Sequence, residues 1–233
     1  MRASTPGSMG PPAPAGERGR AQRRAWPALL AATLAALLFA AVASPRVDYE
    51  GAAAEALDRG EAGSDLTPHE REAALATARR VGVFAAYLDA AIGTALRAVG
   101  MAIALWAAFQ VAGGHPDFRG SFSVACRGLL PGALRRVASL PALLGRTELS
   151  PFELGRLLPA GPGALLEPGA RGPLPSLLWS VDLFSLAAVA LVAAGMAAVA
   201  GVTLRRSLAT TAVLWIGEVA VLEVALPALG GLR

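Results

Sequence analysis

The sequence predicts an all-α fold, a polytopic bundle of about five transmembrane helices with a cytoplasmic N-terminus. Three observations carry this prediction. The 233 residues are 55% hydrophobic and only 16% charged, whereas a soluble domain is usually about 45–50% apolar and about one-quarter charged. The mean hydropathy is +0.51. Several runs with few or no charges approach the roughly 20 residues that a helix needs to cross the hydrocarbon core. The predicted spans are 26–44, 93–113, 121–145, 176–202 and 207–230.

The N-terminal region combines a polar tail with the first span. Residues 1–25 are rich in Pro, Gly and Ser, and they carry five arginines against one glutamate, which predicts a disordered, basic cytoplasmic tail. The run "WPALLAATLAALLFAAVAS", 26–44, has no charge and is long enough to span a membrane. A basic flank before an apolar run that ends "AVASP" is also typical of a signal peptide. Both interpretations place residue 45 and its successors outside the cytoplasm.

Residues 45–92 predict a polar, extracytoplasmic helical segment. Within it, the stretch "LTPHERE" has the pattern of a helix start. We expect Thr67 to be the N-cap, Pro68 to take the first helical position and Glu70 to complete a capping box.

The helix that begins there has no clear stop before Gly113 and Gly114, although Gly82 and Gly93 are positions at which it could be interrupted. An unbroken helix over 68–112 would be about 67 Å long, roughly twice the thickness of the hydrocarbon core. Only 93–113 is therefore expected to be immersed. Arg97 is expected to extend toward the outer headgroups, as long basic side chains near helix ends do.

The third span, 121–145, is the least regular of the five. Its sequence "SFSVACRGLLPGALRRVASLPALLG" contains two prolines and the basic residues Arg127, Arg135 and Arg136. Proline is tolerated in membrane helices where neighbouring groups satisfy the freed carbonyls, and Arg127 is expected to be interfacial. The alternative is that this segment does not span and that its arginines lie at the interface. The following residues, 146–175, read as a loop with one short helix capped by Ser150.

The last two spans are strongly apolar. Asp182 is the only charge in 176–202. It lies near the start of its helix, where a carboxylate meets the positive end of the helix dipole, so we expect a capping or interfacial role. "GMAAVAG" places Gly195 and Gly201 among small residues that permit close helix packing, although the alanine-rich composition of the chain explains this pattern equally well.

Two glutamates interrupt the last span, in "LWIGEVAVLEVALP". Counted along the helices from their cytoplasmic ends, Glu218 and Glu223 lie at depths of about 17 and 24 Å, and Arg135 at about 21 Å. A lone charge at the bilayer centre costs at least about 2.5–3.5 kcal/mol. We therefore expect Arg135 or Arg136 to pair with one of the glutamates. The alternative is that these four residues line a proton or ion path.

The sequence contains no pattern that predicts an enzyme, a cofactor or a metal site. His69, His115 and Cys126 are too far apart for the ligand spacing of a zinc site. Nucleophile elbows, phosphate-binding loops and zinc-protease motifs do not occur. The 21 basic residues are all arginine and are dispersed, whereas a nucleic-acid-binding domain needs a clustered basic face. No small-molecule substrate is indicated either.

From about residue 66 to 230 the chain resembles the bacterial branch of the YIP (Ypt-interacting protein) family of membrane domains. The resemblance rests on "LTPHEREAAL", "ALWAAFQVAGG", "GSFSVACRGLLPGALRRVASLPALL" and "LLWSVDLFSL", in this order and with similar loop lengths. It implies an all-helical integral membrane protein with about five spans and a cytoplasmic N-terminus, in which 93–233, with the loop 146–175, is the YIP-like membrane domain. The segment 26–44 departs from the pattern as an extra apolar run before the long helix.

The resemblance implies a non-enzymatic multi-pass protein of membrane organisation or protein interaction, resident in the bacterial inner membrane. Eukaryotic relatives bind small GTPases in vesicle traffic, but no motif here carries GTPase binding over. The expected partners are the lipid bilayer and either a second copy or other membrane proteins. The alternative function is a small ion, proton or solute transporter or channel that uses the intramembrane Glu and Arg residues.

Overall fold

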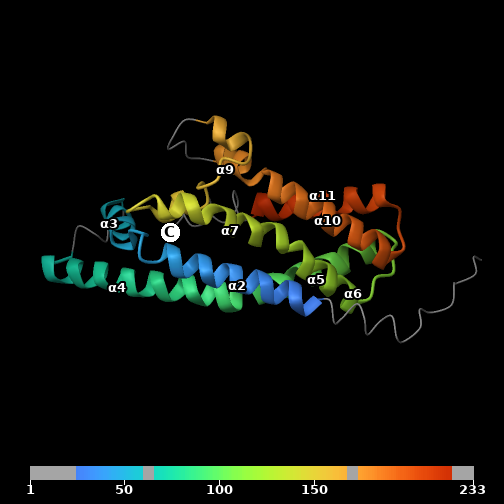
Figure 1. Cartoon of the computed structure of the whole chain (residues 1–233), viewed down its shortest axis with the longest axis horizontal. Coiled ribbons are helices and arrows are strands. Elements are labelled where there is room, and N and C mark those ends of the chain that lie inside the picture. The colour runs from blue at the N-terminus through green and yellow to red at the C-terminus, as the bar shows by residue number, and fades with distance from the viewer. Residues whose placement is uncertain (1–24, 60–65, 167–172, 222–233) are drawn as a thin grey trace, which may run out of the picture.

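The structure of the protein is a computed structural model that describes residues 25–59, 66–166 and 173–221. The regular elements in these residues are helices, joined at one point by an isolated parallel bridge between Val47 and Leu149. The helices form an elongated bundle in which successive long segments run back and forth along the long axis (Figure 1). The prediction of an all-α fold is confirmed.

The first described helix, α2 (Ala25–Ala43), is apolar around its whole circumference, which is typical of a membrane span and not of a surface helix. Small residues occupy its buried face at intervals of three or four, for example Ala32, Ala36 and Ala40, so neighbouring helices pack closely there. Leu30 and Leu34, on another face, are more than half exposed. α2 packs mainly against α7 (Leu130–Leu144).

The second segment is one long helix, Pro68–Val111, of 44 residues. It consists of α4 (Pro68–Leu88), a π-helical turn η2 (Asp89–Gly93) and α5 (Thr94–Val111). The predicted capping box is confirmed: Thr67 is the N-cap, its side chain accepts from the Glu70 N–H, and the Glu70 side chain accepts from the Thr67 N–H. The expectation that this helix continues to the glycines at 113 and 114 is confirmed as well, since it ends at Val111.

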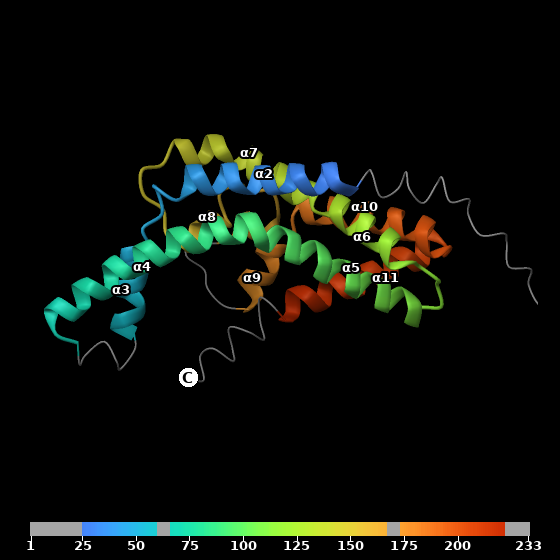
Figure 2. The same cartoon turned by 90° about the horizontal axis from the view of Figure 1, so that it is seen from below.

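A second helix, α3 (Tyr49–Arg59), packs against α4 to form a helical hairpin. The hairpin extends beyond the other helices at one end of the bundle (Figure 2). α4 has no buried residue, because only α3 and the end of α2 cover parts of its surface.

The predicted span 121–145 is corrected by the structure, because it is not one helix. α6 (Phe118–Gly128) ends before Leu129, and α7 begins at Leu130. Pro131 stands in the first turn of α7, where proline starts a helix readily but cannot donate a hydrogen bond to the preceding turn. α6 also begins three residues earlier than predicted, because the Asp117 side chain accepts from the Gly120 N–H at 3.2 Å.

The fourth span is shorter than predicted. Residues 176–202 divide into α9 (Pro173–Ser180) and α10 (Leu183–Ala200), which begins after Asp182. α10 ends at Gly201, whose positive φ of 66° gives a left-handed cap, a conformation that favours glycine. The region predicted as the loop 146–175 contains the short helix α8 (Pro151–Leu154) with the predicted Ser150 capping box, and the 3-10 turn η3 (Pro162–Leu165).

The last helix, α11 (Leu204–Ala220), starts three residues before the predicted span, because the Thr203 hydroxyl accepts from the Arg206 N–H. The rest of that span, with Glu223, lies outside the described residues. The main core joins α5, α6 and α10 around Phe109, Val124 and Met196. Within the described residues, three helices are long and apolar enough to cross a membrane: Ala25–Ala43, Pro68–Val111 and Leu183–Ala200.

Candidate functional site

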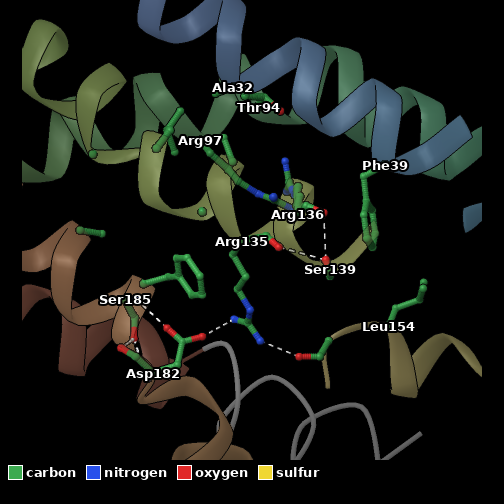
Figure 3. Close-up of a pocket in the computed structure, with 17 residues that line it drawn as sticks. Ala32, Phe39, Thr94, Arg97, Arg135, Arg136, Ser139, Leu154, Asp182 and Ser185 are labelled. Atoms are coloured by element: carbon green, nitrogen blue, oxygen red, sulfur yellow. Dashed lines mark hydrogen bonds and ion pairs between the residues drawn. The ribbon is translucent and has the colours of Figure 1, made fainter. Parts of the chain in front are cut away.

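The centre of the bundle contains an ion pair between α7 and the start of α10. A guanidinium nitrogen of Arg135 lies 2.7 Å from a carboxylate oxygen of Asp182, whose side chain is only 4% exposed. The same guanidinium donates to the Gly155 carbonyl at 2.6 Å. Arg135 therefore joins three elements, α7, the end of α8 and the start of α10, as Figure 3 shows.

Asp182 is held in place by its own helix. It is the N-cap of α10: one carboxylate oxygen accepts from the Ser185 N–H at 2.6 Å, and the Asp182 N–H donates to the Ser185 hydroxyl at 2.9 Å. The other oxygen is the one that faces Arg135. A single buried carboxylate thus caps a helix and neutralises the cation of Arg135, whose side chain is 30% exposed. Each of these two roles favours a carboxylate at this position.

The predicted pairing of Arg135 or Arg136 with Glu218 is not seen in the structure, and the predicted pairing with Glu223 lies outside the described residues. Arg135 pairs with Asp182. Glu218 is exposed on α11, and no ion pair joins it to another residue of the described ranges. A common depth predicted from the sequence does not imply contact, because the packing of α7 against α10 brings Asp182 and not Glu218 to Arg135.

Arg136 stands beside Arg135 but has a different environment. Within the described residues it makes no ion pair, and its side chain is partly buried. The Ser139 hydroxyl next to it donates to the backbone carbonyls of Arg135 and Arg136. In Figure 3 the two arginine side chains diverge, Arg135 toward Asp182 and Arg136 toward Arg97.

Two further arginines of the sequence prediction form local contacts. Arg97 on α5 pairs with Asp89 of the π-helical turn, at 2.9 and 3.2 Å. Gly93 lies between them, and a side chain there would collide with Asp89, so this glycine leaves room for the carboxylate to lie along the helix. Arg127 donates to the Ser123 hydroxyl at 3.1 Å within α6.

A cavity of about 440 Å³ lies among these groups. α2, α5, α7, α8 and α10 all contribute to its wall, and three guanidinium groups line it against one carboxylate: Arg97, Arg135, Arg136 and Asp182. Apolar side chains such as Phe39 and Leu154 complete the wall (Figure 3). Glu218 does not line it. Within the described residues, no group of three or more His, Cys, Asp or Glu side chains is placed to hold a metal ion.

The sequence did contain a signal for Asp182, since "DLFS" places an N-cap aspartate three residues before a serine. It contained no signal for the Arg135–Asp182 contact, because the two residues belong to segments that only the tertiary packing of α7 and α10 brings together.

Comparison with known proteins gives one family. The family model of the Yip1 domain matches residues 12–224. The match begins before α2 and so extends further toward the N-terminus than the resemblance over 66–230. No curated protein and no solved structure matches the chain.

Proposed function

The chain belongs to the Yip1-domain family of non-enzymatic, multi-pass membrane-trafficking proteins, and from this premise we propose that it organises membrane partners through the α3–α4 hairpin. The absence of enzymatic activity and the multi-pass membrane location follow from the family. The kind of partner and the use of the hairpin to contact it are our proposal.

The length of the second segment carries this proposal. The helix Pro68–Val111 has 44 residues, which correspond to about 66 Å, whereas the hydrocarbon core is about 30 Å thick. If Val111 lies at one boundary of the core, most of α4 stands beyond the other boundary. There Val81 and Phe84 are 58% and 68% exposed, and apolar side chains exposed outside the hydrocarbon core favour contact with another protein.

We further propose that the chain crosses the membrane five times, with α6–α7 as a broken crossing and α11 as the last. The N-terminal side of α2, the α5–α6 turn and the α10–α11 turn lie at the same end of the bundle (Figure 1). The two turns touch, since the His115 N–H donates to the Ala200 carbonyl at 3.3 Å. Arg205 and Arg206 stand at this end, which supports a cytoplasmic location for it.

This orientation places the N-terminus in the cytoplasm and the hairpin outside. The resemblance to the bacterial branch of the family supports the bacterial cytoplasmic membrane as the location. Either a second copy or another membrane protein would then contact the hairpin on the extracytoplasmic side.

A photo-reactive amino acid in place of Phe84 tests the hairpin directly. Irradiation of native membranes is expected to give a discrete protein adduct. Leu191 on α10 is the matched control, because it is also apolar and exposed, at 41%, but lies on a membrane span, where we expect only lipid contact. Equal adducts from both positions, or none from Phe84, would contradict the proposal.

A flux assay addresses the transporter alternative. Purified full-length protein in liposomes is expected to conduct neither protons nor small ions, since Glu218 does not line the cavity that contains Arg97, Arg135 and Arg136, called the arginine cavity below. Flux that disappears in the Glu218→Gln variant would replace our proposal by a transport function.

A further inference from the structure

The arginine cavity lies near the boundary of the hydrocarbon core, on the side of the hairpin. Arg97 is about 14 residues, or about 21 Å, from Val111 at the opposite end of the bundle, and Asp182 is about 18 residues, or about 27 Å, from Ala200 at that end. With a hydrocarbon core of about 30 Å, Arg97 and Asp182 lie about 9 and about 3 Å inside the boundary, and a long guanidinium side chain can extend from this depth toward the lipid phosphate groups.

The cationic groups of the cavity exceed its anionic groups. Arg135 is neutralised by Asp182, and Arg97 by Asp89. Arg136 forms no ion pair among the residues that the structure describes, and the Asp89 carboxylate, which also attracts it, is already paired with Arg97. An unpaired charge within the membrane costs at least about 2.5–3.5 kcal/mol at the bilayer centre and less toward the headgroups, so a bound anion would stabilise this arrangement.

The side chains that face the cavity match one class of anion. Arg97 extends from α5 toward Arg136 on α7 (Figure 3), so two guanidinium groups approach one region from different helices. Planar guanidinium groups bind phosphate oxygens with two parallel hydrogen bonds, which a monovalent halide cannot accept. The Arg97–Asp89 pair is about half exposed on both sides, and an exposed pair exchanges its partner at little cost.

The size and the apolar part of the wall agree with a phosphate ester. The cavity volume of about 440 Å³ falls within the range of about 300–1,000 Å³ of small-molecule sites. Phe39, Leu129 and Leu154 supply apolar surface beside the arginines, where the glycerol and upper acyl carbons of a lipid would lie while its phosphate meets the guanidinium groups.

We propose that this cavity is a binding site for a phosphate anion, held by Arg136 and Arg97 and supplied by an anionic phospholipid or by free phosphate. Arg135 is not a ligand in this site. It is a positioning residue, because its pair with Asp182 fixes α10 as one wall of the cavity. The site is independent of the hairpin contact proposed above, since none of its lining residues belongs to α3 or α4.

The test measures thermal unfolding and lipid retention of the full-length protein in nanodiscs. One preparation contains phosphatidylcholine only, a second contains phosphatidylglycerol in addition, and a third contains phosphatidylcholine with added inorganic phosphate. A ligand that binds the folded state raises its unfolding temperature. The variants are Arg136→Gln, Arg136→Lys and, as a matched control, Arg205→Gln, which removes an exposed arginine at the far end of the bundle.

We expect phosphatidylglycerol to stabilise the unaltered protein and the Arg205→Gln variant. In the Arg136→Gln variant the affinity should fall about tenfold, which corresponds to about 1.4 kcal/mol. Arg136→Lys should lose part of the affinity for phosphatidylglycerol, because a lysine cannot form the bidentate contact with a phosphate. In phosphatidylcholine alone, Arg136→Gln should unfold no earlier than the unaltered protein, so that a folding defect is distinguishable from lost binding.

The preparations also identify the source of the anion. Stabilisation by phosphatidylglycerol that depends on Arg136 assigns the site to a lipid, and stabilisation by inorganic phosphate that depends on Arg136 assigns it to the free anion. If neither ligand stabilises the protein, or if Arg136→Gln responds as Arg205→Gln does, the proposal is wrong.

Discussion

Ion pairs of similar length occur in two different environments of this molecule. In the hairpin, Arg71 and Asp58 approach to 2.6 Å with side chains that are 40% and 61% exposed. In the bundle, Arg135 and Asp182 approach to 2.7 Å with side chains that are 30% and 4% exposed. An exposed pair contributes about 0–1 kcal/mol, whereas removal of one partner from a buried pair costs about 3–5 kcal/mol. Burial, and not distance, therefore determines which pair holds helices together.

The largest expected effect comes from breaking the buried pair. Asp182→Ala leaves the Arg135 cation without its partner and removes the N-cap of α10, so the free energy of unfolding should fall by about 3–5 kcal/mol. Denaturation of the full-length protein in detergent micelles measures this loss.

Asp182→Asn separates the two roles of this residue. Asparagine caps a helix as well as aspartate does, so this variant loses the charge and keeps the cap. A double-mutant cycle with Arg135→Gln isolates the coupling between the two side chains. If Asp182→Ala costs no more than Asp58→Ala in the hairpin, the contrast between the two regions is wrong.

The two regions also differ in how much of each the sequence predicts. The start of the hairpin helix was predicted at Thr67, because a capping box involves residues only three positions apart. The length of Pro68–Val111 was predicted as well, because a helix without a stop signal continues. The Arg135–Asp182 pair was not predicted, because the two residues are brought together by the packing of α7 against α10, which no local pattern encodes.

A second, smaller effect tests whether close packing of helices, like the buried ion pair, distinguishes the bundle from the hairpin. Gly195 on α10 faces Val124 on α6, and a Cβ atom there would lie 2.9 Å from both methyl groups of Val124. Gly195→Val should lower the free energy of unfolding by about 1–3 kcal/mol, as overpacking does. Gly100 on α5 has nothing within 4 Å of its Cβ position, so Gly100→Val should change stability by no more than about 0.5 kcal/mol.

Val124→Ala in the Gly195→Val background is expected to restore part of the loss, because it removes the methyl groups that the new side chain meets. Thermal unfolding of the unaltered protein, Gly195→Val, Gly100→Val and the Gly195→Val/Val124→Ala double variant measures these changes in stability. Equal effects at Gly195 and Gly100 would indicate that α6 and α10 do not depend on close approach.

In the hairpin, removal of the exposed pair should have a smaller effect. Asp58→Ala is expected to lower the free energy of unfolding by less than about 1 kcal/mol, and the difference should disappear at high salt, which screens exposed charges. Chemical denaturation at low and high ionic strength checks this expectation. A loss that persists at high salt would mean that the hairpin pair is shielded from water, in contrast to the exposure of its two side chains in the structure.

The smallest effect is a pH dependence at the tip of the hairpin. The Thr67 hydroxyl and the Thr67 N–H donate to the Glu70 carboxylate at 2.7 and 2.8 Å, and these two hydrogen bonds lower the pKa of Glu70. Because the pKa is lower in the folded state, this capping interaction is fully present above the pKa of Glu in the unfolded chain, about 4.3. It is lost as the pH falls through the lowered folded value.

Hydrogen-exchange protection factors for the first turn of α4 should therefore decrease in acid, while those of the first turn of α11, which is capped by the hydroxyl of Thr203 and not by a carboxylate, stay constant. Glu70→Gln is the matched control, since glutamine also completes a capping box but does not titrate. An acid-induced loss of protection that is the same in Glu70→Gln would assign it to another group. A loss confined to the unaltered protein would show that the exposed hairpin responds to the pH of the solvent where the buried bundle does not. This difference is expected if the hairpin is the part of the molecule that meets a partner.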